Sequence, residues 1–149
     1  MKKYSFYLAL ILILGLVSCN NSKNEQAPDT KEIADNVIEV LDFHSTHRCM
    51  TCTTIEEKTR AMLAESYAKE MKNGVITFQT INVDEESNKE LAEEFAAYGT
   101  ALFLHVIKNG ESTQVDLTNF AFMSAMNEDG SFEDGLKTEI EKALQALES

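Results

Sequence analysis

Residues 37–52 decide the fold, and they read Val-Ile-Glu-Val-Leu-Asp-Phe-His-Ser-Thr-His-Arg-Cys-Met-Thr-Cys. Residues 37–43 form a short, mostly apolar run, which is typical of a buried β-strand. Residues 53–71 follow with apolar side chains near one face of a helix, and Asn73-Gly74 is the stop signal that ends it. The pair Cys49 and Cys52 therefore stands where a strand gives way to a helix.

The rest of the chain predicts three more strands. We expect them at residues 75–83, 101–107 and 112–117, and Asn109-Gly110 is a hairpin signal between the last two. The helix between the first two strands makes them parallel, whereas the hairpin makes the last two antiparallel. The predicted fold class is thus α/β, with a mixed central β-sheet flanked by helices.

Two more helices are expected. The first starts at Ser87, which has capping-box spacing with Glu90, and ends at Ala97. The second follows Ser131, which is expected to cap it together with Asp134.

Residues 118–130 fit either a helical turn or a packed loop. The acidic pair Glu56-Glu57 is interpreted as part of a solvated helix face. Five methionines are interpreted as core-filling side chains. They are Met50, Met62, Met71, Met123 and Met126.

The N-terminus has the pattern of an export signal. Two lysines precede the apolar run 4–17, which is shorter than the about 20 residues of a membrane-spanning helix. The run ends in a segment, residues 16–19, that resembles the cleavage site of bacterial lipoproteins. This resemblance implies a signal peptide over residues 1–18 and a lipid on Cys19; the alternative is an ordinary signal peptide with a coincidental cysteine. Residues 19–31 would then be a lipidated, flexible tether, and residues 32–149 the folded domain.

The charge and the cysteine count agree with an exported, lipid-anchored protein. The chain carries a net charge of −12, and removing residues 1–18, which hold two lysines and no acidic residue, would make it −14. This balance argues against nucleic-acid binding and leaves the acyl chains at Cys19 as the link to the lipid bilayer. We expect the cell envelope, facing the periplasm, and Asn20 favours the outer membrane. Disulfides persist in that compartment, and three cysteines then divide into one lipidated residue and one pair.

The cysteine pair is the candidate catalytic site. A thiol in the first turn of a helix meets unpaired backbone N–H groups, and such settings lower its pKa from about 8.5 to roughly 3.5–7.5. Arg48 and His47 are candidate thiolate-stabilising residues. Cys49 is therefore expected to attack a substrate, and Cys52, one turn further on, to resolve the product. The alternatives are an inert disulfide and half of a zinc site, but no second CxxC exists to complete the latter.

Two further interpretations concern polar residues near the pair. Asp42 interrupts an apolar strand and is a candidate proton acceptor for Cys52; otherwise it lies at an edge or on the surface. The set Cys49, Cys52 and His47 could bind a soft metal ion or an arsenical. The simpler alternative is that His47 is a solvated loop residue.

The order of these motifs resembles a thioredoxin-fold protein over about residues 35–147. The segments that carry the resemblance are residues 41–43, 81–84, 94–99 and 108–111, arranged around the CxxC. More narrowly, residues 43–49 resemble a family of small exported thioredoxin-like proteins. That family is linked to aromatic-arsenical resistance gene clusters and described as a nitrophenyl-compound nitroreductase subunit. One departure is that the position of the family's cis-proline falls near Leu102, and no proline follows Pro28.

These observations predict a membrane-anchored thiol–disulfide oxidoreductase that uses a CxxC dithiol in the cell envelope. Its partners would be a redox protein, a small thiol or an arsenical, and no organic cofactor is expected, because no flavin or nicotinamide fingerprint is present. The alternative is thiol-based binding of a trivalent organoarsenical or soft metal ion without turnover. A third possibility is a structural domain with an idle disulfide.

Overall fold

The computed structural model describes residues 36–149. The predicted signal peptide, the lipidation site Cys19 and the tether lie outside the described residues. The regular elements, in chain order, are β1 (Asn36–His44), α1 (Met50–Ser66), α2 (Ala68–Lys72), β2 (Ile76–Asn82), the 3-10 turn η1 (Glu86–Asn88), α3 (Lys89–Glu94), β3 (Ala101–Lys108), β4 (Glu111–Asp116), α4 (Thr118–Ser124) and α5 (Ser131–Glu148).

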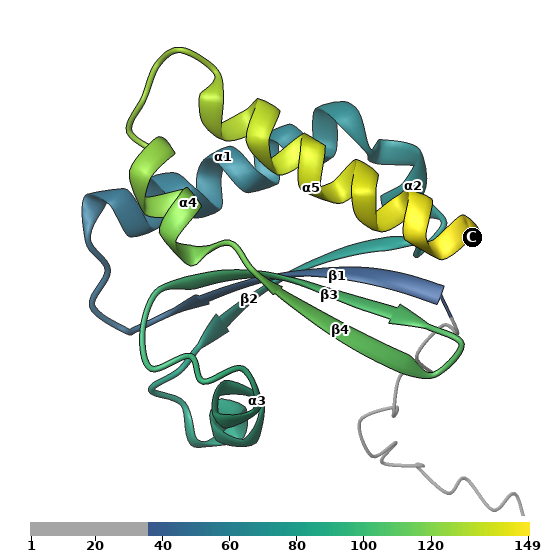
Figure 1. Ribbon diagram of the computed structural model, residues 1–149. Coiled ribbons are helices and arrows are strands. Elements are labelled where there is room, and N and C mark those ends of the chain that lie inside the picture. The colour runs from purple at the N-terminus through teal and green to yellow at the C-terminus, as the bar shows by residue number, and fades with distance from the viewer. Residues whose placement is uncertain (1–35) are drawn as a thin grey trace, which may run out of the picture. The chain divides into compact units, whose positions relative to one another are not determined.

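One mixed sheet organises these elements, with the strand order β2-β1-β3-β4 (Figure 1). β1 and β2 run parallel, with Val40 opposite Phe78, because α1 and α2 return the chain to the same end of the sheet. β3 runs antiparallel to β1, with Asp42 opposite Leu102, and β4 pairs antiparallel with β3 through a tight hairpin. The predicted α/β class with a mixed central sheet is confirmed.

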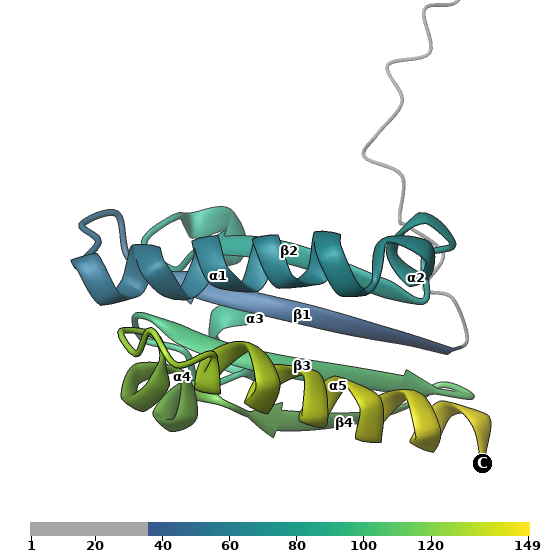
Figure 2. The same cartoon turned by 90° about the horizontal axis from the view of Figure 1, so that it is seen from above.

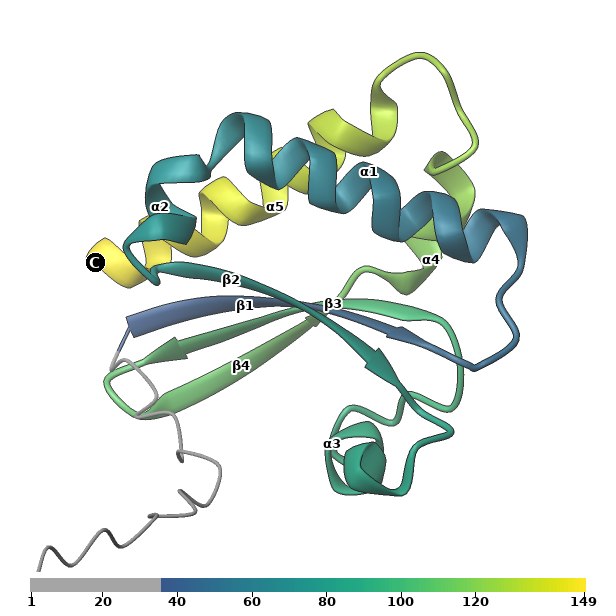
Figure 3. The ribbon, with the colours of Figure 1, turned by 180° about the vertical axis from the view of Figure 1, so that it is seen from behind.

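Helices cover both faces of the sheet. α1 and α5 lie side by side over one face, with α4 beside the N-terminal half of α1, as Figures 1 and 2 show. α3 lies beneath the opposite face, at the end of the sheet where β1 runs into the cysteine loop (Figure 3). The candidate site therefore sits at one end of a three-layer arrangement.

β1 is a central strand, and its sequence explains why. Ile38 and Val40 point into the core shared with α1 and α5. Leu41 and Phe43 point into a second core, which Phe95 and Phe103 complete with ring centroids 5.2–5.9 Å apart. A strand buried on both faces needs a nearly continuous apolar run, which residues 37–43 supply.

The structure corrects three local predictions. The helix expected over residues 53–71 breaks at Tyr67, whose backbone leaves the helical region and whose ring packs into the core near α5. The short helix α3 has Asn88 as its N-cap residue, without a side-chain cap, so the capping box of Ser87 and Glu90 is wrong. The last helix, α5, has Gly130 as its N-cap residue, so the cap expected from Ser131 and Asp134 is wrong.

The ambiguous segment 118–130 contains both a helix and a loop. α4 buries Ala121 and Ser124, and it turns its other face to solvent. Met123 on this outer face is 74% exposed. Met126, after α4, is 52% exposed and Met50, at the start of α1, is 76% exposed, so three of the five methionines do not fill the core. Met62 is buried and Met71 partly buried, as predicted. Within residues 36–149, no helix is long and apolar enough to cross a membrane.

Candidate functional site

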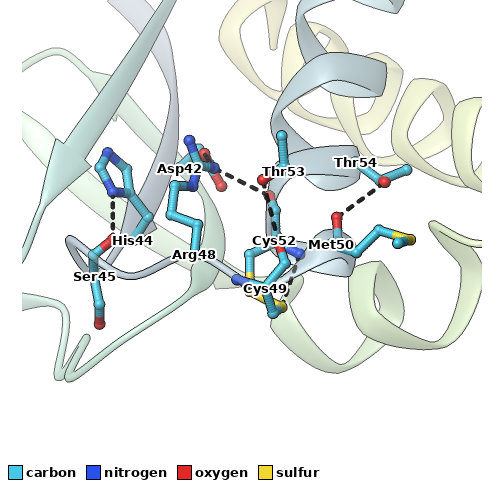
Figure 4. The surroundings of a disulfide bond; sticks show 9 residues. All are labelled: Asp42, His44, Ser45, Arg48, Cys49, Met50, Cys52, Thr53 and Thr54. Atoms are coloured by element: carbon cyan, nitrogen blue, oxygen red, sulfur yellow. Dashed lines mark hydrogen bonds and ion pairs between the residues drawn. A yellow bond between two sulfur atoms is a disulfide. The ribbon is translucent and has the colours of Figure 1, made fainter.

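A disulfide between Cys49 and Cys52 opens α1, with their Cα atoms 5.1 Å apart (Figure 4). Cys49 is the N-cap of the helix, and its sulfur accepts a hydrogen bond from the backbone N–H of Cys52 at 3.1 Å. In return the N–H of Cys49 donates to the sulfur of Cys52 at 3.3 Å. The two sulfurs thus fill the roles that oxygen atoms take in a capping box.

The two cysteines differ in exposure. Cys49 is exposed, whereas Cys52 is 7% exposed. In the dithiol form, the N–H groups at the start of α1 and the helix dipole would favour a thiolate at Cys49 over a thiol. The arrangement suits an outer sulfur that attacks and an inner sulfur that resolves.

Arg48 precedes the disulfide, and its side chain turns inward. Nη2 donates to the carbonyl oxygen of Cys52 at 3.1 Å and lies 3.4 Å from Oδ2 of Asp42. Nη1 donates to Glu56 on the next turn of α1. Figure 4 shows this side chain reaching from the loop toward Asp42, so its hydrogen bonds go to oxygen atoms and not to the sulfur atoms.

Asp42 is fully buried in β1, on the sheet face that carries α1. Burial raises the pKa of its carboxyl from 3.8 to about 7, because removal from water penalises the charged form more than the attraction of Arg48 favours it. One oxygen, Oδ1, has no hydrogen-bond partner. The alternative position for Asp42, at an edge or on the surface, is therefore wrong.

Glu56 belongs to this site, although its sequence context suggested a solvated helix face. Burial raises the pKa of Glu56, but hydrogen bonds from Arg48 and Arg60 outweigh burial and hold that pKa below its ordinary value. Arg60 donates to the second oxygen of Glu56 at 2.7 Å. The sequence spacing could have predicted this, because Glu56 and Arg60 follow Cys52 at intervals of four and therefore lie on the same face of the helix.

None of the three histidines has a hydrogen bond to the disulfide, Arg48 or Asp42. His47 is exposed, and His44 turns its Nδ1 to the backbone oxygen of Ser45, away from the disulfide in Figure 4. His105 pairs with Glu39 at 2.9 Å on the far side of the sheet. In the described part of the chain, no group of three or more His, Cys, Asp and Glu side chains is placed to hold a metal ion.

Leu102, the residue nearest the expected cis-proline position, is buried within β3 and hydrogen-bonds through its backbone to Leu117 and Thr118. Residues 36–149 contain no cis peptide bond. Gly99, in the loop that leads into β3, lies beside Ser45 of the loop before the disulfide. This loop therefore lies beside the loop that leads into the cysteine pair, while Leu102 lies opposite Asp42 in the sheet.

A cysteine pair that opens the helix of a parallel β–α–β unit is the arrangement of thioredoxin-type redox motifs. The fold is thioredoxin-like. No family model and no curated protein matches the chain. Among solved structures, Fasciola hepatica thioredoxin is similar with a TM-score of 0.37 and 24% identity; the match covers 53% of this chain and 66%, just under two thirds, of that one. A malarial protein is similar with a TM-score of 0.38 and 21% identity over 59% of this chain and 94% of its own.

Proposed function

We propose that the protein is a thiol–disulfide oxidoreductase. The observation that carries the proposal is the disulfide itself, in which an exposed Cys49 caps α1 and a buried Cys52 lies one turn further in. Structural disulfides have no need of an exposed sulfur at a helix N-terminus, whereas exchange requires an accessible, stabilised thiolate.

The exchange starts from the dithiol form. The thiolate of Cys49 attacks one sulfur of a substrate disulfide and forms a mixed disulfide with it. The S–S bond of the substrate breaks, and the other substrate sulfur leaves as a thiolate that takes a proton from solvent. Cys52 then gives up its proton, and its sulfur attacks Sγ of Cys49, which releases the second substrate thiolate. The protein has lost two electrons and holds the Cys49–Cys52 disulfide, while the substrate has gained them.

Asp42 is the proton acceptor for Cys52 in this proposal. Arg48 Nη2 contacts both the Asp42 carboxyl and the backbone oxygen of Cys52, so one guanidinium links the carboxyl to the resolving residue. A carboxyl with a pKa of about 7 can take and return a proton near neutral pH. We assign no metal or organic cofactor to this step.

We further propose that Cys19 carries a lipid and tethers the domain to a membrane of the cell envelope, facing the periplasm. The support is the basic start, the apolar run 4–17 and the small residue Ser18 before Cys19. Growth with a labelled fatty acid should label the wild-type chain and leave Cys19→Ser unlabelled and absent from the membrane fraction. Equal labelling of both chains would refute the lipid anchor.

Trapping of a mixed disulfide tests the oxidoreductase. Reduced Cys52→Ser should form a stable adduct through Cys49 with glutathione disulfide, whereas Cys49→Ser should form none at the same concentration. The wild type should reduce insulin disulfides with a dithiol present. A redox potential far below about −300 mV, together with no exchange, would place the disulfide in the structural class instead.

The same reduced protein tests capture of a trivalent organoarsenical or soft metal without turnover. The first supporting observation is that reduction of the disulfide would free two thiols on one turn of a helix. The second is that thioredoxins have a cis-proline near the cysteine pair, whereas this chain has Leu102 at the corresponding position. Phenylarsenite should then protect both thiols from alkylation at one equivalent. Unchanged alkylation rates would exclude capture and leave the exchange reaction.

A further inference from the structure

Two buried polar atoms of the site lack hydrogen-bond partners, and they belong to residues that already touch. They are Oδ1 of Asp42 and Nε of Arg48. The neighbouring atoms, Oδ2 and Nη2, are 3.4 Å apart, which is long for a charge-assisted hydrogen bond. Nε and Nη2 lie on the same edge of the planar guanidinium. The unpaired donor Nε could therefore bond the unpaired acceptor Oδ1 while Nη2 bonds Oδ2.

The opposite edge of the guanidinium is held in place. Nη1 donates to Oε2 of Glu56, and Arg60 holds the other oxygen of Glu56 from the solvent side. Nη2 also donates to the carbonyl oxygen of Cys52 at 3.1 Å. Arg48 is thus anchored on α1, and the edge that faces Asp42 remains incomplete.

We propose that Arg48 is a positioning residue, which closes a two-bond fork on Asp42, Nε to Oδ1 and Nη2 to Oδ2, whenever that carboxyl is ionised. The role rests on the thiol–disulfide function proposed above. A protonated carboxyl carries an O–H on one of its oxygens and no longer accepts one N–H group on each oxygen as the ionised group does, so the fork opens when Asp42 takes the proton of Cys52. The open fork is the state found here together with the disulfide. When a substrate dithiol reduces the disulfide, the proton returns to Cys52 and the fork closes again.

The charged groups around Asp42 fix the direction of its response. Burial raises the pKa of Asp42 most and Glu56 raises it further, while Arg48 and Arg60 lower it. The residues opposite Asp42 on the neighbouring strands, Thr80 on β2 and Leu102 on β3, are uncharged. Removing Arg48 should therefore raise the pKa of Asp42, and removing the charge of Glu56 should lower it.

Carboxyl and guanidinium NMR titrations of the full-length protein in mild detergent test the fork. In the wild type, the Nε–H signal of Arg48 should titrate with the same midpoint as the Asp42 carboxyl. Arg48→Met should raise that midpoint by about one unit or more, the lower end of the range for loss of an adjacent opposite charge. Arg48→Lys, which keeps the charge but has no fork, should also raise it, and Glu56→Gln should lower it.

Two further measurements separate positioning from mere structural support. Arg60→Met removes a nearby charge that does not touch Asp42, so it should move the midpoint less than Arg48→Met does. The pH profile for release of the mixed disulfide should shift with the Asp42 midpoint in each variant. If Arg48→Met and Arg48→Lys lower the unfolding temperature and leave both midpoint and profile in place, the fork is wrong. Absence of exchange in the wild type would instead refute the proposed function, because the titration needs no turnover.

Discussion

Replacing Asp42 by asparagine should stabilise the oxidised protein, and increasingly so as the pH rises. The carboxyl is fully buried, and its pKa is raised from 3.8 to about 7. The native state therefore binds more protons than the unfolded state between about pH 4 and pH 7, and the stability contributed by Asp42 is lost as the pH rises through that window. Asparagine has nearly the same shape and never ionises.

The magnitude follows from the shift. The pKa of Asp42 is raised by about three units, and each unit corresponds to about 1.4 kcal/mol. An ionised Asp42 therefore destabilises the folded state by at most ~4 kcal/mol. Asparagine also weakens the contact with Arg48, which costs about 1 kcal/mol at every pH. The variant should thus exceed the wild type by roughly 3 kcal/mol at pH 8, whereas at pH 4 it should be less stable than the wild type by up to about 1 kcal/mol.

Urea unfolding followed by far-UV circular dichroism, at intervals from pH 4 to pH 8, measures the difference. Asp84→Asn is the matched control, because the backbone N–H of Thr46 holds the pKa of exposed Asp84 below its ordinary value. Its contribution has the opposite sign, since the stability it gives is lost on acidification. A difference for Asp42→Asn that stays flat or shrinks as the pH rises would mean that Asp42 is ionised throughout, and would refute the burial argument.

A pair of glycine substitutions and the alkylation of the cysteines test two other features of the structure. Gly135→Ala should lower the free energy of unfolding by about 1–3 kcal/mol, since its Cβ would collide with the ring of Phe120. Gly99→Ala, whose Cβ would have its nearest neighbour at 3.9 Å, should change little in the same urea titration. In the reduced protein, iodoacetamide should label Cys49 at least about tenfold faster than Cys52, as mass spectrometry of a time course would show, because Cys52 is only 7% exposed; equal rates would contradict the assigned division of roles.

Much of the fold follows from local sequence rules. Residues 37–43 are mostly apolar on both faces and form the central strand β1, and Asn109-Gly110 marks the hairpin between β3 and β4. The position of the cysteine pair at the start of α1 was predicted from the sequence, because the pattern of apolar residues changes there from that of a strand to that of a helix. Long-range packing decided the rest: Tyr67 leaves the helix because its ring enters the core beside α5, a contact 70 residues away in the chain.

The candidate site was predicted less completely, for a physical reason. Sequence distance places Arg48 next to Cys49, which suggested a charge beside the thiolate, but the side chain is long enough to reach oxygen atoms on β1 and α1 instead. Glu56 looked like one of several exposed acidic residues until the fold placed it against Arg48. Which way a flexible charged side chain turns depends on partners that only the tertiary structure brings near.

Stability alone would not select a carboxyl at residue 42. Its neighbours on the same face of β1, Ile38 and Val40, are fully buried apolar residues, and an apolar side chain between the sheet and α1 would avoid a cost of about 4 kcal/mol at neutral pH. Departures of this kind are expected at functional sites. A solvated aspartate, with a pKa near 4, would remain ionised throughout thiol exchange and would hold a proton poorly. The burial that destabilises Asp42 is therefore also what brings its pKa to the range in which it can accept a proton from Cys52 and return it.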